Sequence, residues 1–256
     1  MITAGIDVGS NTTKVVILKN GEWLGDALVL TGADNRSSAE RALAQAVKAA
    51  GIKRTEITQY VATGYGRINI PFADRKVTEI SCHGRGAHAV FPGTRTVIDI
   101  GGQDSKVIRV DASGRVADFI MNDKCAAGTG RFLEVMARAL EITLTEMAAI
   151  AGKNKNPVTI SNTCTVFAES EVISYLAQGL PKDDIIRGLH EAVVDRIESM
   201  ALRLGIEPAV TMTGGVALNA AIVTTLVRRL KLTILLPPQP QLIGAYGAAL
   251  IAAKQA

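Results

Sequence analysis

The chain has 256 residues, enough for one large domain or for two lobes that each have a core. Hydrophobic residues make up 48% of it, charged residues 20% and aromatic residues 4%, and the formal net charge is only +4. This composition is typical of a globular protein and argues against nucleic-acid binding; because no apolar run reaches ~18 residues, we expect no membrane association.

Three strands are expected at the start of the chain, over residues 2–8, 12–19 and 23–30, with Asn20-Gly21 as the hairpin signal between the last two. Residue 1 leads directly into this pattern, so we expect no signal peptide. Ser37 and Ser38 should cap a helix that ends at residue 50 before Gly51. A strand over 57–62, a loop over 63–67 and a helix over 79–91 follow. We interpret Cys82, His83 and His88 in that helix as packing or surface residues.

A spaced motif in the first hairpin occurs again in the second half of the chain. Asp7-x-Gly-x-x-x-x-Lys14 is repeated as Asp99-x-Gly-x-x-x-x-Lys106, and each copy precedes a further strand and a hairpin turn. Glycines in such turns let backbone N–H groups approach a phosphate closely. The paired spacing predicts two similar lobes whose glycine turns face each other and hold a polyphosphate between them. Either turn taken alone is more simply interpreted as an ordinary hairpin.

The remaining elements alternate between helices and short strands. We expect a helix over 131–140 and a second that begins at a Thr143–Glu146 capping box and ends near residue 152. A third should follow the capping cluster over 161–171 and end near residue 178, and a fourth should run from Pro181 to Gly205. A fifth should follow the turn over 213–217 and end at residue 230, and the last should cover 241–253. Strands are expected over 158–160, 210–212 and 232–236, a polar loop over 153–156, and a glycine turn over 213–217.

Cys125 and Cys164 both precede helical patterns, where the helix dipole lowers the pKa of a thiol and favours an anionic metal cluster. They are too far apart for zinc-knuckle or ferredoxin spacing. A zinc site or an iron–sulfur cluster normally needs four ligands, so two chains would be required to complete one. The alternative is two buried core cysteines. The absence of a secretory pattern favours a reducing, cytoplasmic location over a disulfide framework.

Two segments carry a more specific resemblance. Residues 122–132 (NDKCAAGTGRF) and 161–171 (SNTCTVFAESE) resemble the ATPase activators of 2-hydroxyacyl-CoA dehydratases and the related ATPase subunits of benzoyl-CoA reductases, that is, the BadF/BadG/BcrA/BcrD ATPase family. The resemblance implies an α/β fold of the actin, hexokinase and heat-shock-chaperone ATPase type, with two duplicated lobes of mixed sheet and flanking helices. The expected boundaries are 1–92 for the first lobe and 93–240 for the second. Residues 241–256 should pack back toward the first lobe.

The resemblance also implies a homodimer with one 4Fe-4S cluster, ligated by Cys125 and Cys164 of each chain, and with ATP and Mg²⁺ between the lobes of each subunit. The implied nucleotide-binding residues are Ser10, Asn11, Thr12, Thr13 and Lys14 in the first turn, Gly101, Gly102, Gln103 and Asp104 in the second, Gly214, Gly215, Val216 and Ala217 near the nucleoside, and Gln241 and Gly244 near the base. The catalytic assignments are Asp7 and Asp104 for hydrated magnesium, and Gln103 or Asp104 for orienting the attacking water.

The expected function is an ATP-dependent activator. ATP hydrolysis would drive a low-potential electron, received from a ferredoxin or flavodoxin, to a 2-hydroxyacyl-CoA dehydratase or a benzoyl-CoA-type reductase. One alternative is a sugar or small-molecule kinase of the same fold, which leaves both cysteines unexplained. A second alternative is a nucleotide-binding scaffold without catalytic activity.

Overall fold

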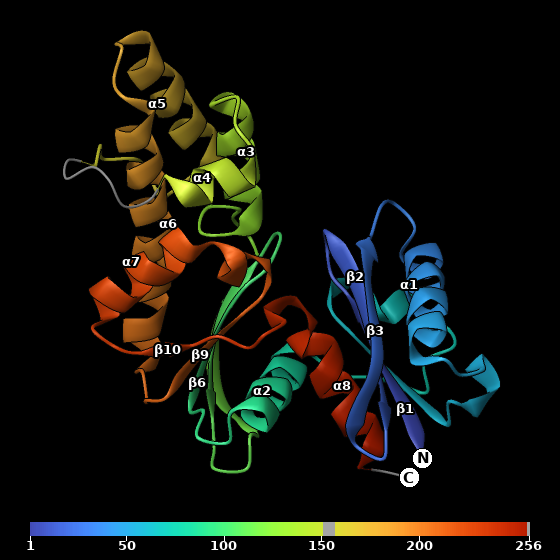
Figure 1. The fold of residues 1–256 in the computed structure, drawn as a ribbon. Coiled ribbons are helices and arrows are strands. Elements are labelled where there is room, and N and C mark those ends of the chain that lie inside the picture. The colour runs from blue at the N-terminus through green and yellow to red at the C-terminus, as the bar shows by residue number, and fades with distance from the viewer. Residues whose placement is uncertain (151–156, 255–256) are drawn as a thin grey trace.

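The computed structural model describes residues 1–150 and 157–254 and consists of two five-stranded mixed sheets with flanking helices (Figure 1). The strand orders are β3-β2-β1-β4-β5 and β10-β9-β6-β7-β8. The two orders correspond strand by strand, because β1, β2 and β3 of the first sheet hold the places that β6, β7 and β8 hold in the second. The structure therefore confirms the duplicated α/β fold.

The first sheet is buried on both faces. Its strands are β1 (Ile2–Val8), β2 (Thr12–Lys19), β3 (Glu22–Leu30), β4 (Gln59–Thr63) and β5 (Arg75–Lys76). Alternate residues of β2 point to opposite faces: Val15 and Ile17 belong to the core under α1 (Asn35–Ala50), whereas Val16 and Leu18 pack with α8 (Ile243–Ala253). Helix α8, although it ends the chain, thus covers a face of the first sheet.

The second sheet carries the larger core. Its strands are β6 (Thr96–Ile100), β7 (Ser105–Val110), β8 (Val116–Asn122), β9 (Val210–Thr213) and β10 (Ile234–Leu235). Helix α2 (Glu79–Val90) packs on one face, against Ile108 and Val110, and next to α8. The other face packs on the long helix α6 (Lys182–Leu204). Helices α2 and α8 consequently lie between the two sheets (Figure 1).

The remaining helices gather on the second sheet's side of the molecule (Figure 1). They are α3 (Gly130–Ala139), α4 (Leu144–Ala149), α5 (Thr165–Ala177) and α7 (Ala220–Leu230), and short 3₁₀ turns occur at Arg54–Glu56, Tyr65–Asn69, Gly215–Leu218 and Pro240–Leu242. The Thr143–Glu146 capping box is present. The predicted helix end near residue 152 and the loop over 153–156 lie outside the described residues. Among the described residues, no helix combines the length and the apolar character that crossing a membrane requires.

Two local predictions were wrong. Helix α1 is capped by Asp34, whose carboxylate accepts from the amides of Arg36 and Ser37, and not by the two serines. Residues 158–160 form no strand: the Val158 amide donates to the Asp184 carbonyl oxygen, and a Cβ added at Gly188 would come within 2.3 Å of the Val158 carbonyl oxygen. Gly188 lets this segment lie close to α6, and no strand among the described residues pairs with it.

Candidate functional site

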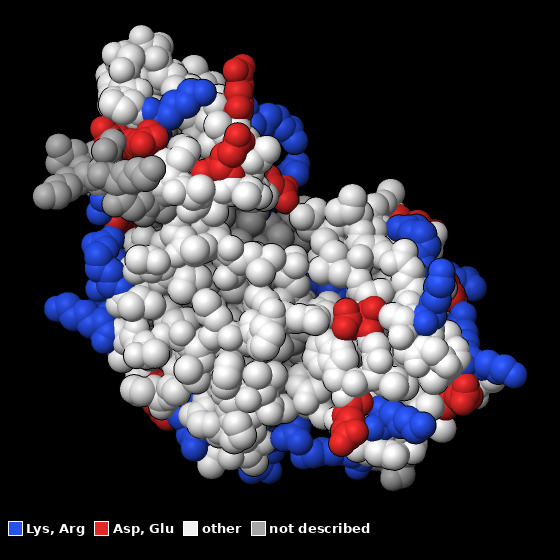
Figure 2. Space-filling model, viewed as in Figure 1, with Lys and Arg blue, Asp and Glu red and all other residues white. Residues whose placement is uncertain are grey.

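The two glycine turns meet across one cavity of about 390 Å³ between the sheets. The first glycine turn (residues 7–14) joins β1 to β2, and the second glycine turn (residues 99–106) joins β6 to β7. In each turn the aspartate and the lysine are register partners, and the lysine Nζ lies 3.2 Å from the aspartate Oδ2. The spaced motif is thus one ion-paired hairpin used twice. Figure 2 shows the hollow between the two lobes on the viewed face.

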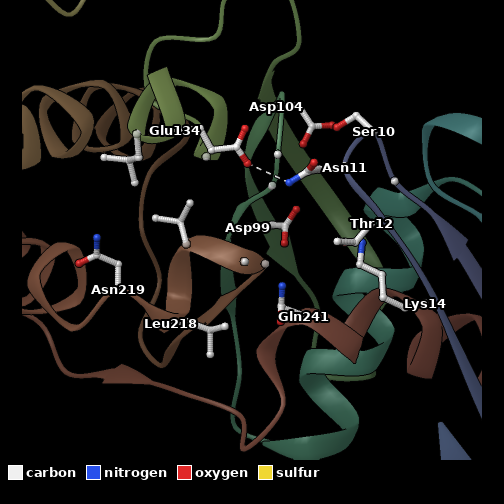
Figure 3. A pocket seen from close by; sticks show the side chains of 18 of the residues that line it. Ser10, Asn11, Thr12, Lys14, Asp99, Asp104, Glu134, Leu218, Asn219 and Gln241 are labelled. Atoms are coloured by element: carbon white, nitrogen blue, oxygen red, sulfur yellow. Dashed lines mark hydrogen bonds between the residues drawn. The ribbon is translucent and has the colours of Figure 1, made fainter. Parts of the chain in front are cut away.

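The first glycine turn contributes polar side chains to the cavity. The Gly9 amide donates to the Thr12 carbonyl oxygen at 3.1 Å, and Ser10, Asn11 and Thr12 line the cavity, as does Lys14. Asn11 reaches across to the other lobe, where its Nδ2 donates to Oε1 of Glu134 on α3 at 2.9 Å (Figure 3).

Thr13 differs from its neighbours. Its side chain is fully buried and its hydroxyl bonds to those of Thr31, at 2.9 Å, and Ser38. Thr13 therefore stabilises the turn from its buried side, because successive side chains of a strand point to opposite faces.

The second glycine turn is held closed by the Gly101 amide, which donates to the Asp104 carbonyl oxygen at 2.9 Å. Gly101, Gly102 and Asp104 line the cavity. Gln103 is exposed at the tip of the turn and is not among the lining residues. Of the two residues expected to orient water, only Asp104 therefore faces the cavity.

Lys106 is the most heavily paired cation of the site. Its side chain is 1% exposed, and its Nζ lies 2.8 Å from Asp104, 3.2 Å from Asp99 and 3.8 Å from Glu79. Burial alone would lower the pKa of Lys106, but the three carboxylates raise it well above its usual value. Burial alone would likewise raise the pKa of Asp99, but His83 and Lys106 hold it well below the usual range. Both groups are charged at neutral pH.

Glu79, the first residue of α2, lines the same cavity. Burial raises its pKa to about 7; Lys106 opposes this rise, and the neighbouring carboxylates of Asp104, Asp7 and Asp99 add to it. The cavity thus contains a carboxylate that is partly protonated near neutral pH.

The turn after β9 forms a third side of the cavity. Gly214 has a φ of 87°, and a Cβ there would meet the Ile100 carbonyl oxygen at 2.3 Å, so only glycine fits. Gly215, Val216 and Gln241 line the cavity, with Leu218 and Asn219 beside them (Figure 3). Ala217 is buried in the core of the second lobe instead.

Gly244 lies beside two side chains that line the cavity. A Cβ there would come within 2.8 Å of His83 Nε2 and 2.9 Å of Asp7 Oδ2. The position expected near a base is therefore in contact with the Asp7 end of the cavity.

Sequence reasoning missed His83. Its ring is buried, lines the cavity, and places Nδ1 3.0 Å from Thr213 Oγ1 and 3.2 Å from Asp99 Oδ1. The interpretation as a packing residue was incomplete, since the partners lie far along the chain. A histidine next to Cys82 on the buried face of a helix was the available signal. Asp99 and Lys106 were recognised in the repeat but not as members of the site.

Cys125 and Cys164 lie outside the cavity lining, and both are partly exposed. Cys164 is the N-cap of α5, as predicted, whereas Cys125 lies in the loop before Thr129, the N-cap of α3. The two cysteine segments touch, because Cys125 Sγ donates to the Thr163 carbonyl oxygen at 3.3 Å. Within residues 1–150 and 157–254, no group of three or more metal-binding side chains occurs. One chain thus offers a pair of accessible thiols, which is half of the donor set of an iron–sulfur cluster.

The chain is similar to known proteins along nearly its whole length. A family model described as the BadF/BadG/BcrA/BcrD ATPase family matches residues 4–252. The activator of lactoyl-CoA dehydratase of Anaerotignum propionicum is 51% identical over 100% of this chain and 99% of its own. The crystal structure of (R)-2-hydroxyglutaryl-CoA dehydratase component A of Acidaminococcus fermentans is 47% identical and superposes with a TM-score of 0.95, covering 100% of this chain and 98% of that one.

A second solved structure contains a nucleotide analogue. It is the activator of the 2-hydroxyisocaproyl-CoA dehydratase from Clostridium difficile with bound ADPNP, at 46% identity and a TM-score of 0.94, covering 100% of this chain and 95% of that one. A glucokinase of the ROK family from Streptomyces griseus shares the fold alone, at 14% identity and a TM-score of 0.62, covering 99% and 100%. A benzoyl-CoA reductase subunit of Thauera aromatica is 32% identical over 97% of this chain and 92% of its own.

Proposed function

Because this chain belongs to the BadF/BadG/BcrA/BcrD ATPase family, we propose that it is an ATP-hydrolysing activator that delivers a low-potential electron to a 2-hydroxyacyl-CoA dehydratase. The observation that carries the proposal is the single cavity lined by both glycine turns, whose hydroxyls, amides and lysines suit a polyphosphate from two sides. The relatives named as dehydratase activators supply the reaction class.

The nucleotide would lie across the cavity with its phosphates between the two turns. Ser10, Asn11 and Thr12 can donate to the terminal phosphates from the first lobe, and Lys14 adds positive charge. Gly101 and Gly102 let the backbone of the second turn come close. The nucleoside would lie toward the turn formed by Gly214, Gly215 and Val216, with Gln241 near the base. Ala217 would act there through packing, whereas Gly244 lies at the Asp7 end of the cavity.

Two carboxylates suit hydrated Mg²⁺ next to the phosphates. Asp7 and Asp104 both line the cavity, and oxygen donors of this kind are preferred by Mg²⁺, which usually keeps several waters. Asp104 is also our assignment for orienting the attacking water, since it faces the cavity while Gln103 is exposed; Gln103 could take part only if nucleotide binding redirected it. The bound ion would neutralise charge that develops on the phosphates.

Cys125 and Cys164 are the proposed ligands of one 4Fe-4S cluster shared by two copies of the chain. Two thiols per chain give the four that a cluster needs, and Sγ of Cys125 already contacts the segment that carries Cys164. Val166 and Phe167, in the first turn of α5 after Cys164, are each 64% exposed, which suits burial against a second copy. When bound, the cluster would supply one-electron chemistry, with a ferredoxin or flavodoxin as the donor.

The dehydratase is the better supported partner, because the dehydratase activators are 46–51% identical to this chain and the benzoyl-CoA reductase component is 32% identical. The sugar-kinase alternative rests on shared fold alone and gives no role to either cysteine.

The test is anaerobic purification, with iron and sulfide analysis, mass determination and ATPase assay. We expect a brown dimer that hydrolyses ATP and whose visible spectrum shifts on adding ATP. Cys125→Ala should lose the iron and still bind nucleotide, whereas Cys82→Ala, at a buried position, should keep it. A Cys125→Ala protein with a full iron complement would overturn the ligand assignment, and a monomeric, iron-free wild type would overturn the redox function.

A further inference from the structure

Helices α2 and α8 are counterparts in the duplicated fold, and they cross at glycines. A Cβ at Gly86 would meet the Ile243 carbonyl oxygen at 2.3 Å, and one at Gly247 would meet the Cys82 carbonyl oxygen at 1.8 Å. The contact is reciprocal: on each helix the glycine follows, by four residues, the residue whose carbonyl oxygen faces the glycine of the other helix. This register makes His83 of α2 the counterpart of Gly244 of α8.

The two aspartates of the repeat therefore have different surroundings. Asp99 is fully occupied: Lys106 lies 3.2 Å from one oxygen, and the other accepts from Thr213 at 2.7 Å and lies 3.2 Å from His83. The charge of Asp99 is therefore balanced by side chains of the protein itself.

Asp7 has fewer partners. Lys14 lies 3.2 Å from its Oδ2, but Thr63, the register partner of Asp7 as Thr213 is of Asp99, does not donate its hydroxyl to Asp7. Where Asp99 faces His83, Asp7 faces Gly244. A side chain at residue 244 would fill the space, since its Cβ would lie 2.8 Å from His83 Nε2 and 2.9 Å from Asp7 Oδ2.

The partners of His83 Nδ1 show which hydrogen this nitrogen must carry. The Thr213 hydroxyl donates to Asp99, so His83 Nδ1 must donate to the acceptors that it faces, Thr213 Oγ1 and the Asp99 carboxylate. In the neutral ring Nε2 is then an acceptor, whereas the imidazolium form, whose charge lowers the pKa of Asp99, donates from both nitrogens. In the described part of the chain the ring makes its ion-pair contact with Asp99 alone, so Nε2 and Asp7 Oδ2 are two acceptors less than about 6 Å apart that share one space.

We propose that this space holds a water of the hydration shell of the divalent cation that accompanies the nucleotide, so that His83 and Gly244 belong to the cation site. A water there can donate one hydrogen to His83 Nε2 and the other to Asp7 Oδ2 while its oxygen faces the cation. The inference rests on the proposed nucleotide function. It assigns Asp7, and not its counterpart Asp99, to the cation.

The test uses Mn²⁺ as the probe, with ADP, on the full chain without iron, and measures free Mn²⁺ by electron paramagnetic resonance. ADP affinity in EDTA is measured in parallel. His83→Asn places an amide near Nδ1 and removes the acceptor at Nε2, whereas His83→Gln places an amide near Nε2 and loses the contact with Asp99. Gly244→Ala fills the space directly. His88→Asn, on the same helix and outside the cavity lining, is the matched control.

We expect His83→Asn and Gly244→Ala to weaken Mn²⁺ binding about tenfold, the effect of losing a hydrogen bond to a charged group, and to weaken ADP binding in EDTA by much less. His83→Gln should keep more of the Mn²⁺ affinity than His83→Asn, and His88→Asn all of it. Wild-type Mn²⁺ affinity in both His83→Asn and Gly244→Ala would overturn the inference. A wild type that binds neither ADP nor Mn²⁺–ADP would instead overturn the proposed function.

Discussion

The amide of Gly130 donates to the carbonyl oxygen of Gly101 at 2.9 Å, which joins the first residue of α3 to the second glycine turn. The next amide, that of Arg131, donates to the Gly102 carbonyl oxygen at 2.7 Å. The loop that carries Cys125 ends at this junction. Any displacement of the second turn must therefore either move the end of the cysteine loop or break these two hydrogen bonds.

The other end of the cysteine loop is held by Asn122, whose Nδ2 donates to the carbonyl oxygens of Cys125, at 2.8 Å, and Ala127, at 3.1 Å. Asn122→Ala should leave both acceptors without this donor, cost about 1–3 kcal/mol in the free energy of unfolding, and speed alkylation of Cys125 by iodoacetamide. Urea unfolding and mass spectrometry measure the two effects.

The internal control for that alkylation is Cys82, which is fully buried and should stay unreactive in both proteins. Asn122→Asp should be worse than Asn122→Ala, because it turns carboxylate oxygens toward carbonyl oxygens. An unchanged alkylation rate in Asn122→Ala would contradict the role given to this side chain.

The two lysines of the repeat should differ in their importance for stability. Lys106→Met leaves Asp99, Asp104 and Glu79 without their buried cation and should cost about 3–5 kcal/mol in the free energy of unfolding. Lys14→Met, at a side chain that is 13% exposed and has one carboxylate partner, should cost less. Urea unfolding of both variants tests this, and equal losses would contradict the asymmetry.

The sequence could predict those contacts of the site that depend on the spacing of residues within one hairpin. Asp7 and Lys14 are register partners in one hairpin, so their separation along the chain sets their contact, and the same is true of Asp99 and Lys106. His83 has no such local signal, because its partners on β6 and β9 are brought to it only by the packing of α2.

A second repeat became visible only in three dimensions. Gly64 and Gly214 each follow a threonine that is the register partner of a repeat aspartate. Their φ angles are 84° and 87°, and each is the N-cap of a 3₁₀ turn. In the sequence these turns share little beyond Thr-Gly and a final Asn, and the first was interpreted as a plain loop. The two turns therefore share a backbone conformation, and only a few of their residues need to be the same for it to form.

Glu79→Gln should change how stability depends on pH. The pKa of Glu79 is about 7 in the folded chain, against 4.5 as its ordinary value, so between these values the folded state binds more protons than the unfolded state. Glu79 therefore makes stability fall as the pH rises from 4.5 to 7, by up to about 3 kcal/mol. In EDTA and without nucleotide, the difference in unfolding free energy between Glu79→Gln and wild type should grow across this range. A constant difference would contradict the burial of a charged Glu79.

His190→Leu should have the opposite effect. Both ring nitrogens of His190 are buried without a hydrogen-bond partner, and burial lowers its pKa from 6.5 to about 4. Below pH 6.5 the unfolded chain takes up a proton that the folded chain does not, so this group makes stability fall as the pH drops toward 4. The leucine variant should lose that fall, and at pH 7 its free energy of unfolding should match or exceed that of the wild type, since two unpaired polar atoms are removed.

Glu79 and His190 act in opposite directions over overlapping pH ranges, so each variant should reveal the slope that the other group causes. Relative to wild type, the free energy of unfolding should rise from pH 5 to 7 in Glu79→Gln and fall in His190→Leu. Urea unfolding at each pH measures both slopes, and parallel curves for the two variants would exclude this account.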